Sequence, residues 1–117
     1  MNLIVYTDAA SSGGGPEGPA AIAYLILESE TKYVLEKESK YIGYKTSNQA
    51  EYEALIAALG SAIKFGDSAI CYSDSKLMVG QINGNTKIID SKMRIEWRKV
   101  VGLKEKFKKR RLQNEWW

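Results

Sequence analysis

The pentapeptide ICYSD at residues 70–74 has the same pattern as IVYTD at residues 4–8. Each consists of an apolar residue, a further residue, a tyrosine, a hydroxyl residue and an aspartate, as expected at the end of a buried strand. Because side chains alternate along a strand, each aspartate shares a face with its tyrosine. If the two strands are parallel neighbours, Asp8 and Asp74 emerge together at the carboxyl edge of the sheet, where α/β proteins place their sites. The alternative is local: either aspartate could be a turn residue, and Asp74 could cap a helix over residues 75–82.

The segments around these two strands predict a mixed α/β fold. Polar turns separate the first three apolar segments, which predicts an antiparallel meander. Apolar residues then recur at helical spacing, beginning after Thr46, and Gln49 three positions later completes the form of a capping box. Strands followed by helix, strand and helix indicate a mixed sheet with helices packed on it. The expected strands are 3–8, 20–27, 33–43, 69–73 and one within 112–117, and the expected helices are 47–65, 75–82 and 91–109.

Glu51 stands on the apolar side of the first predicted helix. It shares a stripe with Leu55 and Ala58, four and seven positions later, whereas Glu53 is expected on the solvated side. A buried carboxylate needs a partner, because burial without one costs several kcal/mol or raises its pKa. No arginine occurs in residues 1–93 to supply that partner. Two strand-end aspartates and a glutamate at the edge of the core are explained together by a hard divalent cation such as Mg²⁺.

The composition bounds the chemistry that this chain can perform. Its 117 residues, 44% hydrophobic and 26% charged, fit one globular domain spanning residues 1–117. The chain contains no histidine, which excludes a Ser-His-Asp triad, and its one cysteine, Cys71, excludes an internal disulfide and is expected to be a core residue. No apolar run is long enough to span a membrane, and the opening MNLIVYTD lacks the features of a signal peptide. Together with the cysteine count, this predicts a cytoplasmic protein without membrane contact.

The net charge of +3 is divided unevenly along the chain. Residues 1–86 hold six lysines and ten acidic residues, whereas residues 87–117 hold eleven lysines and arginines and four acidic residues. The charges of the two parts are therefore −4 and +7. Such asymmetry suggests that the C-terminal part contacts a polyanion. A solvated helix face is the alternative explanation.

Three segments of the sequence closely resemble the three successive motifs of type 1 ribonuclease H. They are YTDAASSGGGPEGPAAIAYLI at residues 6–26, TSNQAEYEALIAAL at 46–59 and CYSDSKLMVGQING at 71–84, in the correct order and at the usual intervals. The resemblance covers residues 3–117 and is to the compact prokaryotic or archaeal form. It implies a ribonuclease H-like sheet of five strands, antiparallel in the first three and flanked by helices. It also implies an endonuclease that hydrolyses the RNA strand of RNA–DNA hybrids and leaves a 5′-phosphate.

The resemblance further implies roles for individual residues. Asp8, Glu51 and Asp74 become catalytic, metal-binding carboxylates for Mg²⁺ or Mn²⁺, with two ions about 4 Å apart when substrate is bound. Such a site needs no histidine base. The alternative for residues 46–49 is helix capping alone. The implied nucleic-acid-binding residues are Thr46, at a phosphate of the DNA strand, Ser47, Asn48 and Gln49, at the minor groove, and also Gln81 and Lys87.

One part of the family's pattern is missing. The family carries a fourth acidic residue in a motif of the form Val-x-Arg-Glu-x-Asn-x-x-Ala-Asp, and this sequence ends at Glu115-Trp116-Trp117, where that motif should begin. We therefore expect a domain that is short at its C-terminus and lacks the C-terminal helix. The fourth acid could lie on a tail missing from the sequence, come from another chain, or be absent. Asp90 and Glu115 are possible substitutes, but the spacing of neither supports that role.

Three functions therefore remain open from the sequence. The first is a metal-dependent ribonuclease H. The second is a catalytically weakened nucleic-acid-binding module of the same fold, and the third is a related nuclease acting on double-stranded RNA or DNA. The expected partner is a nucleic acid, with RNA–DNA hybrid first and double-stranded RNA second, and the sequence indicates no obligate protein partner.

Overall fold

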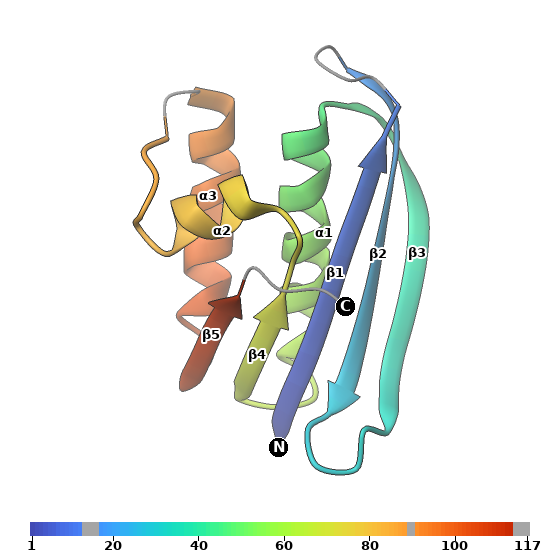
Figure 1. Cartoon of the computed structure of the whole chain (residues 1–117). Helices are drawn as coiled ribbons and strands as arrows, with labels where there is room; N and C mark the ends of the chain where they lie inside the picture. Colours follow the sequence, from blue (N-terminus) through green and yellow to red (C-terminus); the bar gives the residue numbers. More distant parts are fainter. Residues whose placement is uncertain (13–16, 89–90, 114–117) are drawn as a thin grey trace.

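The helices and strands follow the predicted order. The computed structural model describes residues 1–12, 17–88 and 91–113. Together the elements form the mixed α/β fold with flanking helices that the sequence predicts (Figure 1). They are β1 (Asn2–Ser11), β2 (Gly18–Glu28), β3 (Val34–Lys45), α1 (Ser47–Ala62), β4 (Ser68–Tyr72), α2 (Lys76–Ile82), α3 (Ser91–Lys104) and β5 (Lys109–Gln113).

The five strands lie in one sheet in the order β3-β2-β1-β4-β5. β1 pairs antiparallel with β2, and β2 pairs antiparallel with β3, which confirms the meander. β4 pairs in parallel with β1 on one side and with β5 on the other. Tyr6 of β1 lies opposite Tyr72 of β4, so the two matching pentapeptides are side by side and in register, as predicted.

The core lies between the sheet and α1. Alternate residues of β1, namely Leu3, Val5 and Thr7, are buried, and α1 packs against this strand. Figure 1 shows α1 behind the sheet, with α3 beside α1. Cys71 is buried in β4, and burial raises the pKa of its thiol to about 12. The thiol is therefore protonated and unreactive at neutral pH, as expected of a core residue.

The start of α1 confirms the predicted capping box. The start of α2 is capped by a different residue from the one considered in the sequence analysis. The backbone N–H of Gln49 donates to Oγ1 of Thr46 at 3.2 Å, and the N–H of Thr46 donates to Oε1 of Gln49 at 2.9 Å. At α2 the N-cap is Ser75, whose side chain accepts a hydrogen bond from the N–H of Met78 at 3.3 Å. The expectation that Asp74 could cap this helix is therefore wrong.

The end of α1 comes earlier than predicted. The helix ends at Ala62 rather than Phe65, and a turn leads to Gly66. A Cβ atom at Gly66 would lie 2.3 Å from the backbone oxygen of Met1. The chain leaves the helix early because it must pass this closely by the start of β1 before entering β4.

The end of α3 also comes earlier than predicted. The helix ends at Lys104 rather than Lys109, and Phe107 turns into the core, where it is 2% exposed. The backbone N–H of Lys108 then donates to the carbonyl oxygen of Asp67 at 2.7 Å. Burial of one aromatic side chain outweighs the helix propensity of the surrounding lysines, and β5 consequently begins at Lys109.

Candidate active site

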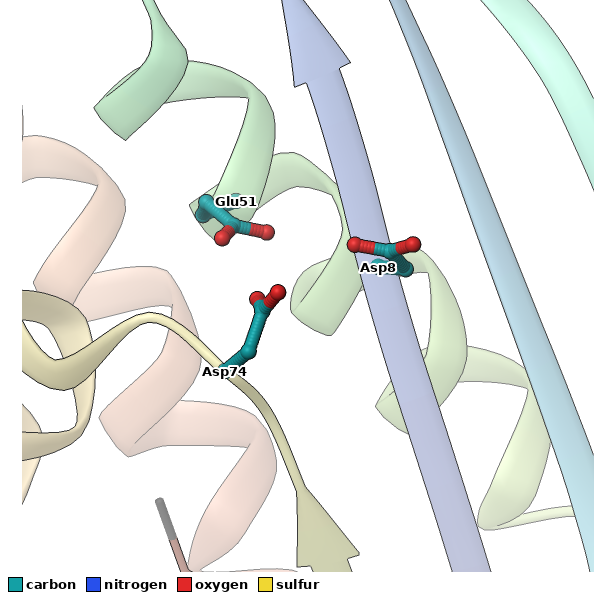
Figure 2. Close-up of side chains that lie close together, drawn as sticks. All are labelled: Asp8, Glu51 and Asp74. Carbon is teal, nitrogen blue, oxygen red and sulfur yellow. The ribbon is translucent and has the colours of Figure 1, made fainter. Parts of the chain in front are cut away.

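Three carboxylates meet at the carboxyl edge of the parallel strands. Asp8 comes from β1, Glu51 from α1 and Asp74 from the turn between β4 and α2 (Figure 2). One carboxylate oxygen from each residue lies within 4.8 Å of the corresponding oxygens of the other two. The prediction that these three residues come together is therefore confirmed.

The unequal lengths of β1 and β4 explain how a helix residue reaches the two aspartates. β4 ends at Tyr72, opposite Tyr6, whereas β1 continues to Ser11. Beyond Tyr6, β1 has no neighbouring strand on its β4 side among the described strands. Glu51, in the second turn of α1, reaches this opening, and Figure 2 shows its carboxylate turned toward that of Asp74.

The residues just before the aspartates restrict where the carboxylates can lie. The rings of Tyr6 and Tyr72 stack with their centroids 5.3 Å apart, two positions before each aspartate. Ser73 is fully buried, and its Oγ accepts a hydrogen bond from the backbone N–H of Ser75 at 3.1 Å. This bond closes the turn that carries Asp74. Stacking and the serine turn thus fix the two strand ends relative to each other.

The electrostatics of the cluster disfavour three ionised carboxylates. Burial, the neighbouring charge of Asp74, a hydrogen bond with Asp74 and the charge of Asp8 together raise the pKa of Glu51 to about 8. Its Oε1 atom is buried without a hydrogen-bond partner among the described residues. A set of carboxylate oxygens with surplus negative charge is the chemistry that suits a hard divalent cation.

The first turn of α1 contains both capping residues and exposed residues. Thr46 and Gln49 are half-buried and bind each other in the capping box. The side chains of Ser47 and Asn48 are exposed, and so is Lys87 in the connection between α2 and α3. Helix capping therefore explains Thr46 and Gln49. It does not explain Ser47 and Asn48. Their contacts with nucleic acid stay a prediction.

Gln81 lies in the core rather than at the surface. The residue is 8% exposed, and its Oε1 accepts a hydrogen bond from the hydroxyl of Tyr52 at 2.6 Å. Its backbone oxygen accepts a hydrogen bond from the indole N–H of Trp97 at 3.2 Å. The resemblance implied a nucleic-acid contact for Gln81, but α2 turns this side chain toward α1. The residue links three helices, and we no longer count it among the residues that face substrate.

The environment of Glu53 was not predicted. Glu53 was expected on the solvated side of α1, but it is half-buried, and its Oε2 lies 3.5 Å from Nζ of Lys45. Helical periodicity could not reveal this ion pair, because it depends on where α1, α3 and the end of β3 meet. These elements enclose a hollow of about 200 Å³ lined by Lys45, Gln49, Glu53, Lys92, Ile95 and Glu96.

The buried hydroxyl of Thr7 was also not predicted. Thr7 is fully buried, and its Oγ1 has no hydrogen-bond partner among the described residues. The sequence does contain a pattern that points to this hydroxyl, because both pentapeptides place a hydroxyl residue directly before the aspartate.

Two candidate residues cannot be placed. Asp90 and Glu115, considered above as substitutes for a fourth carboxylate, lie outside the described residues. Within the described residues, the cluster holds three carboxylates. In the same parts of the chain, no helix combines the length and the apolar character needed to cross a membrane.

Sequence comparison relates the whole chain to one family. A family model described as RNase H matches residues 1–116. The curated bifunctional protein Rv2228c of Mycobacterium tuberculosis is 32% identical over an alignment of 117 positions, which covers 99% of this chain and 31% of that protein. The chain spans 31–39% of the length of the curated relatives that it matches.

Structural comparison leads to the same family. The crystal structure of RNase H1 from the archaeon Halobacterium salinarum superposes with a TM-score of 0.90 at 31% identity, covering 97% of this chain and 84% of that one. LC11-RNase H1, crystallised in complex with an RNA/DNA hybrid, superposes with a TM-score of 0.85 at 32% identity, covering 95% of this chain and 83% of that one.

Proposed function

The chain belongs to the RNase H family, and from that premise we propose that it hydrolyses the RNA strand of RNA–DNA hybrids with the help of divalent cations, leaving a 5′-phosphate. The observation that carries this proposal is the convergence of oxygens from Asp8, Glu51 and Asp74 within 4.8 Å. The choice of substrate draws support from LC11-RNase H1, whose structure contains an RNA/DNA hybrid.

Asp8, Glu51 and Asp74 are the residues that would hold Mg²⁺ or Mn²⁺, two ions when substrate is bound. When bound, such ions activate water for attack and stabilise the charge that develops on the phosphate and the leaving oxygen. The chain's own contribution is to hold two aspartates at a fixed spacing on parallel strands and to bring a third carboxylate from α1. The chain contains no histidine, so its own side chains provide no imidazole base.

Recognition of the hybrid would use the exposed polar residues beside the cluster. The minor groove of an RNA-containing duplex is wide and shallow and displays 2′-hydroxyl groups. Ser47 and Asn48 are exposed and short enough to hydrogen-bond there, while the capping box of Thr46 and Gln49 holds the backbone of this turn. Thr46 and Gln49 would reach substrate from that same turn. Lys87 and the exposed basic residues of α3 would contact phosphates.

A second candidate function is binding of the hybrid without turnover. It is favoured by one observation: residues 87–117 carry a charge of +7. Basic residues bind the phosphates of a duplex without any catalytic cation. Activity measurements on the protein distinguish this candidate from the first.

The test is cleavage of a hybrid labelled on its RNA strand, in Mg²⁺ and in Mn²⁺. We expect the unmodified protein to cut with multiple turnover and Asp8→Asn to lose about 100-fold or more in rate, because cation stabilisation is worth several kcal/mol. Asp67→Asn is the matched control, since Asp67 is an exposed aspartate paired with Lys108 in the connection that precedes β4.

Each result has a definite meaning. Full-rate cleavage by Asp8→Asn would refute the metal-dependent nuclease. Hybrid binding without turnover in saturating Mn²⁺ would establish the second candidate instead. Faster cleavage of double-stranded RNA or DNA than of hybrid would replace the proposed substrate.

A further inference from the structure

Thr7 carries a hydroxyl that the folded chain does not use. The residue is 0% exposed, and its Oγ1 has no hydrogen-bond partner among the described residues. A buried hydroxyl without a partner has lost its hydrogen bonds with water and forms none within the protein, so it lowers the free energy of unfolding. Valine has almost the same shape without this disadvantage. The position of Thr7 therefore needs an explanation outside packing.

Thr7 lies next to a member of the carboxylate cluster, on the face of β1 that packs against α1. Thr7 precedes Asp8 and shares its face of β1 with Leu3 and Val5, the buried residues on which α1 packs. Directly after β4, Ser73 occupies the equivalent place before its own aspartate and is also 0% exposed. The Ser73 hydroxyl accepts a hydrogen bond within its turn, so of the two equivalent hydroxyls one already supports an aspartate.

Within the described part of the chain, Glu51 carries a hydrogen-bond acceptor without a donor. Oε1 of Glu51 is buried and, among the described residues, has no hydrogen-bond partner. Glu51 belongs to α1, the helix that packs against β1, and its carboxylate lies within reach of Asp8, the residue next to Thr7. A partnerless donor and a partnerless acceptor thus occur on facing elements at one end of the core.

We propose that Thr7 is a positioning residue for Glu51: its hydroxyl donates a hydrogen bond to Oε1 of Glu51 when a divalent cation draws the three carboxylates together. The proposal rests on the cation site of the proposed function. Carboxylates that bind a metal through one oxygen are commonly held through the other by a hydrogen bond, and losing that bond costs about 10- to 100-fold in metal affinity. Thr7 would supply this bond from the core side, out of reach of substrate.

The test measures Mn²⁺ binding by calorimetry without substrate, together with thermal unfolding in EDTA. We expect Thr7→Val to unfold at a higher temperature in EDTA and to bind Mn²⁺ about 10-fold more weakly than the unmodified chain. Thr7→Ser and Thr7→Ala provide a second comparison, because both lose the methyl group and they differ only in the hydroxyl. Thr7→Ser should bind Mn²⁺ as the unmodified chain does, and Thr7→Ala should bind it as weakly as Thr7→Val.

Ser61→Ala is the matched control. Ser61 is a buried serine whose hydroxyl is already bonded to Glu36, away from the cluster. Its removal should lower the unfolding temperature and leave Mn²⁺ affinity unchanged, so both measurements distinguish it from Thr7→Val.

The outcomes separate this proposal from the function on which it rests. If the unmodified chain binds no Mn²⁺, the cation site itself is refuted. If it binds Mn²⁺ and Thr7→Val binds equally well, or Thr7→Ser and Thr7→Ala bind alike, the cation site stands and the role of Thr7 is refuted. A lower unfolding temperature for Thr7→Val in EDTA would also overturn the proposal, because the hydroxyl would then have a partner already.

Discussion

At Glu51 the demands of the fold and of the site conflict. Its place on α1 puts the carboxylate at the edge of the core, and Asp8 and Asp74 add their negative charges. Burial and like charge both favour the neutral form of this side chain. An amide of the same shape would suit the folded chain better. The cation site that we propose explains this carboxylate, whereas the folding of the chain does not.

The raised pKa of Glu51 makes stability depend on pH. The pKa is about 8 in the folded chain and 4.5 for the free group. Between these values the folded chain holds a proton that the unfolded chain has released, so the free energy of unfolding in EDTA should fall as pH rises from about 4.5 to about 8. The glutamine in Glu51→Gln cannot titrate, so the free energy of unfolding of this variant should depend less on pH. Denaturant unfolding at pH 5 and pH 8 measures both.

Glu105→Gln is the control for this measurement, because Glu105 is an exposed acid after α3. It should keep the slope of the unmodified chain. Equal pH slopes in the unmodified chain and in Glu51→Gln would contradict the raised pKa.

Single residues were predictable where a local pattern carried the information. The matching pentapeptides located Asp8 and Asp74, and helical spacing placed Glu51 on the core side. Gln81 was misplaced because a motif tells which residues are near a site but not which way each side chain turns. The missing hydrogen bond of Thr7 depends on atoms contributed by several elements, and no spacing within one strand can reveal it.

At the scale of elements, the starts of the helices and the end of α2 at Ile82 were predictable, whereas the ends of α1 and α3 were not. α1 begins where its capping box stands in the sequence, and α2 begins after a serine cap. The ends of α1 and α3 are set by contacts with distant segments, at Met1 for one and in the core around Phe107 for the other. Strand pairing was predictable because two neighbouring strands carry the same pattern of residues.

Substitutions in the turn after α1 test whether close packing against Met1 sets the end of this helix. A Cβ at Gly66 would lie 2.3 Å from a backbone oxygen, whereas a Cβ at Gly60, inside α1, would meet nothing within 4 Å. Gly66→Ala should therefore lower the free energy of unfolding by about 1–3 kcal/mol, the usual cost of overpacking. Gly60→Ala should raise it by about 0.5–1 kcal/mol, because alanine favours helix. Denaturant unfolding measures both. A Gly66→Ala variant as stable as the unmodified chain would refute the close approach.

At the scale of the whole molecule, charge is separated along the chain. The carboxylate cluster belongs to the part with a charge of −4, and the part from residue 87 onward carries +7. Under the proposed function, a duplex would bring phosphates to both parts, so the acidic part would need bound cations, whereas the basic part carries its own positive charge. This division was visible in the sequence, but its meaning depended on the fold, which makes one residue from each of β1, α1 and the β4–α2 turn a single acidic site.

Hybrid binding should therefore weaken with salt, and Lys87 should contribute to that dependence. Lys87→Ala should weaken binding and make the slope of log affinity against log salt concentration shallower by about one. Lys64→Ala is the control, because Lys64 is exposed beyond the C-terminal end of α1, opposite the end with Thr46. Fluorescence anisotropy in Ca²⁺ at several salt concentrations measures both. An unchanged slope for Lys87→Ala would remove this residue from the interface.

The parallel pairing of β1 with β4 also bears on how the chain folds. Asn2 pairs with Ser68 and Tyr6 with Tyr72, so each pair joins residues 66 positions apart. Contacts between such distant residues form slowly, because the intervening chain must lose its freedom before the pairing can stabilise anything. The two hairpin strands and α1 lie within that interval and can form earlier. The acidic cluster is therefore complete only once this long-range pairing has formed, and a bound cation would report that pairing rather than nucleate it.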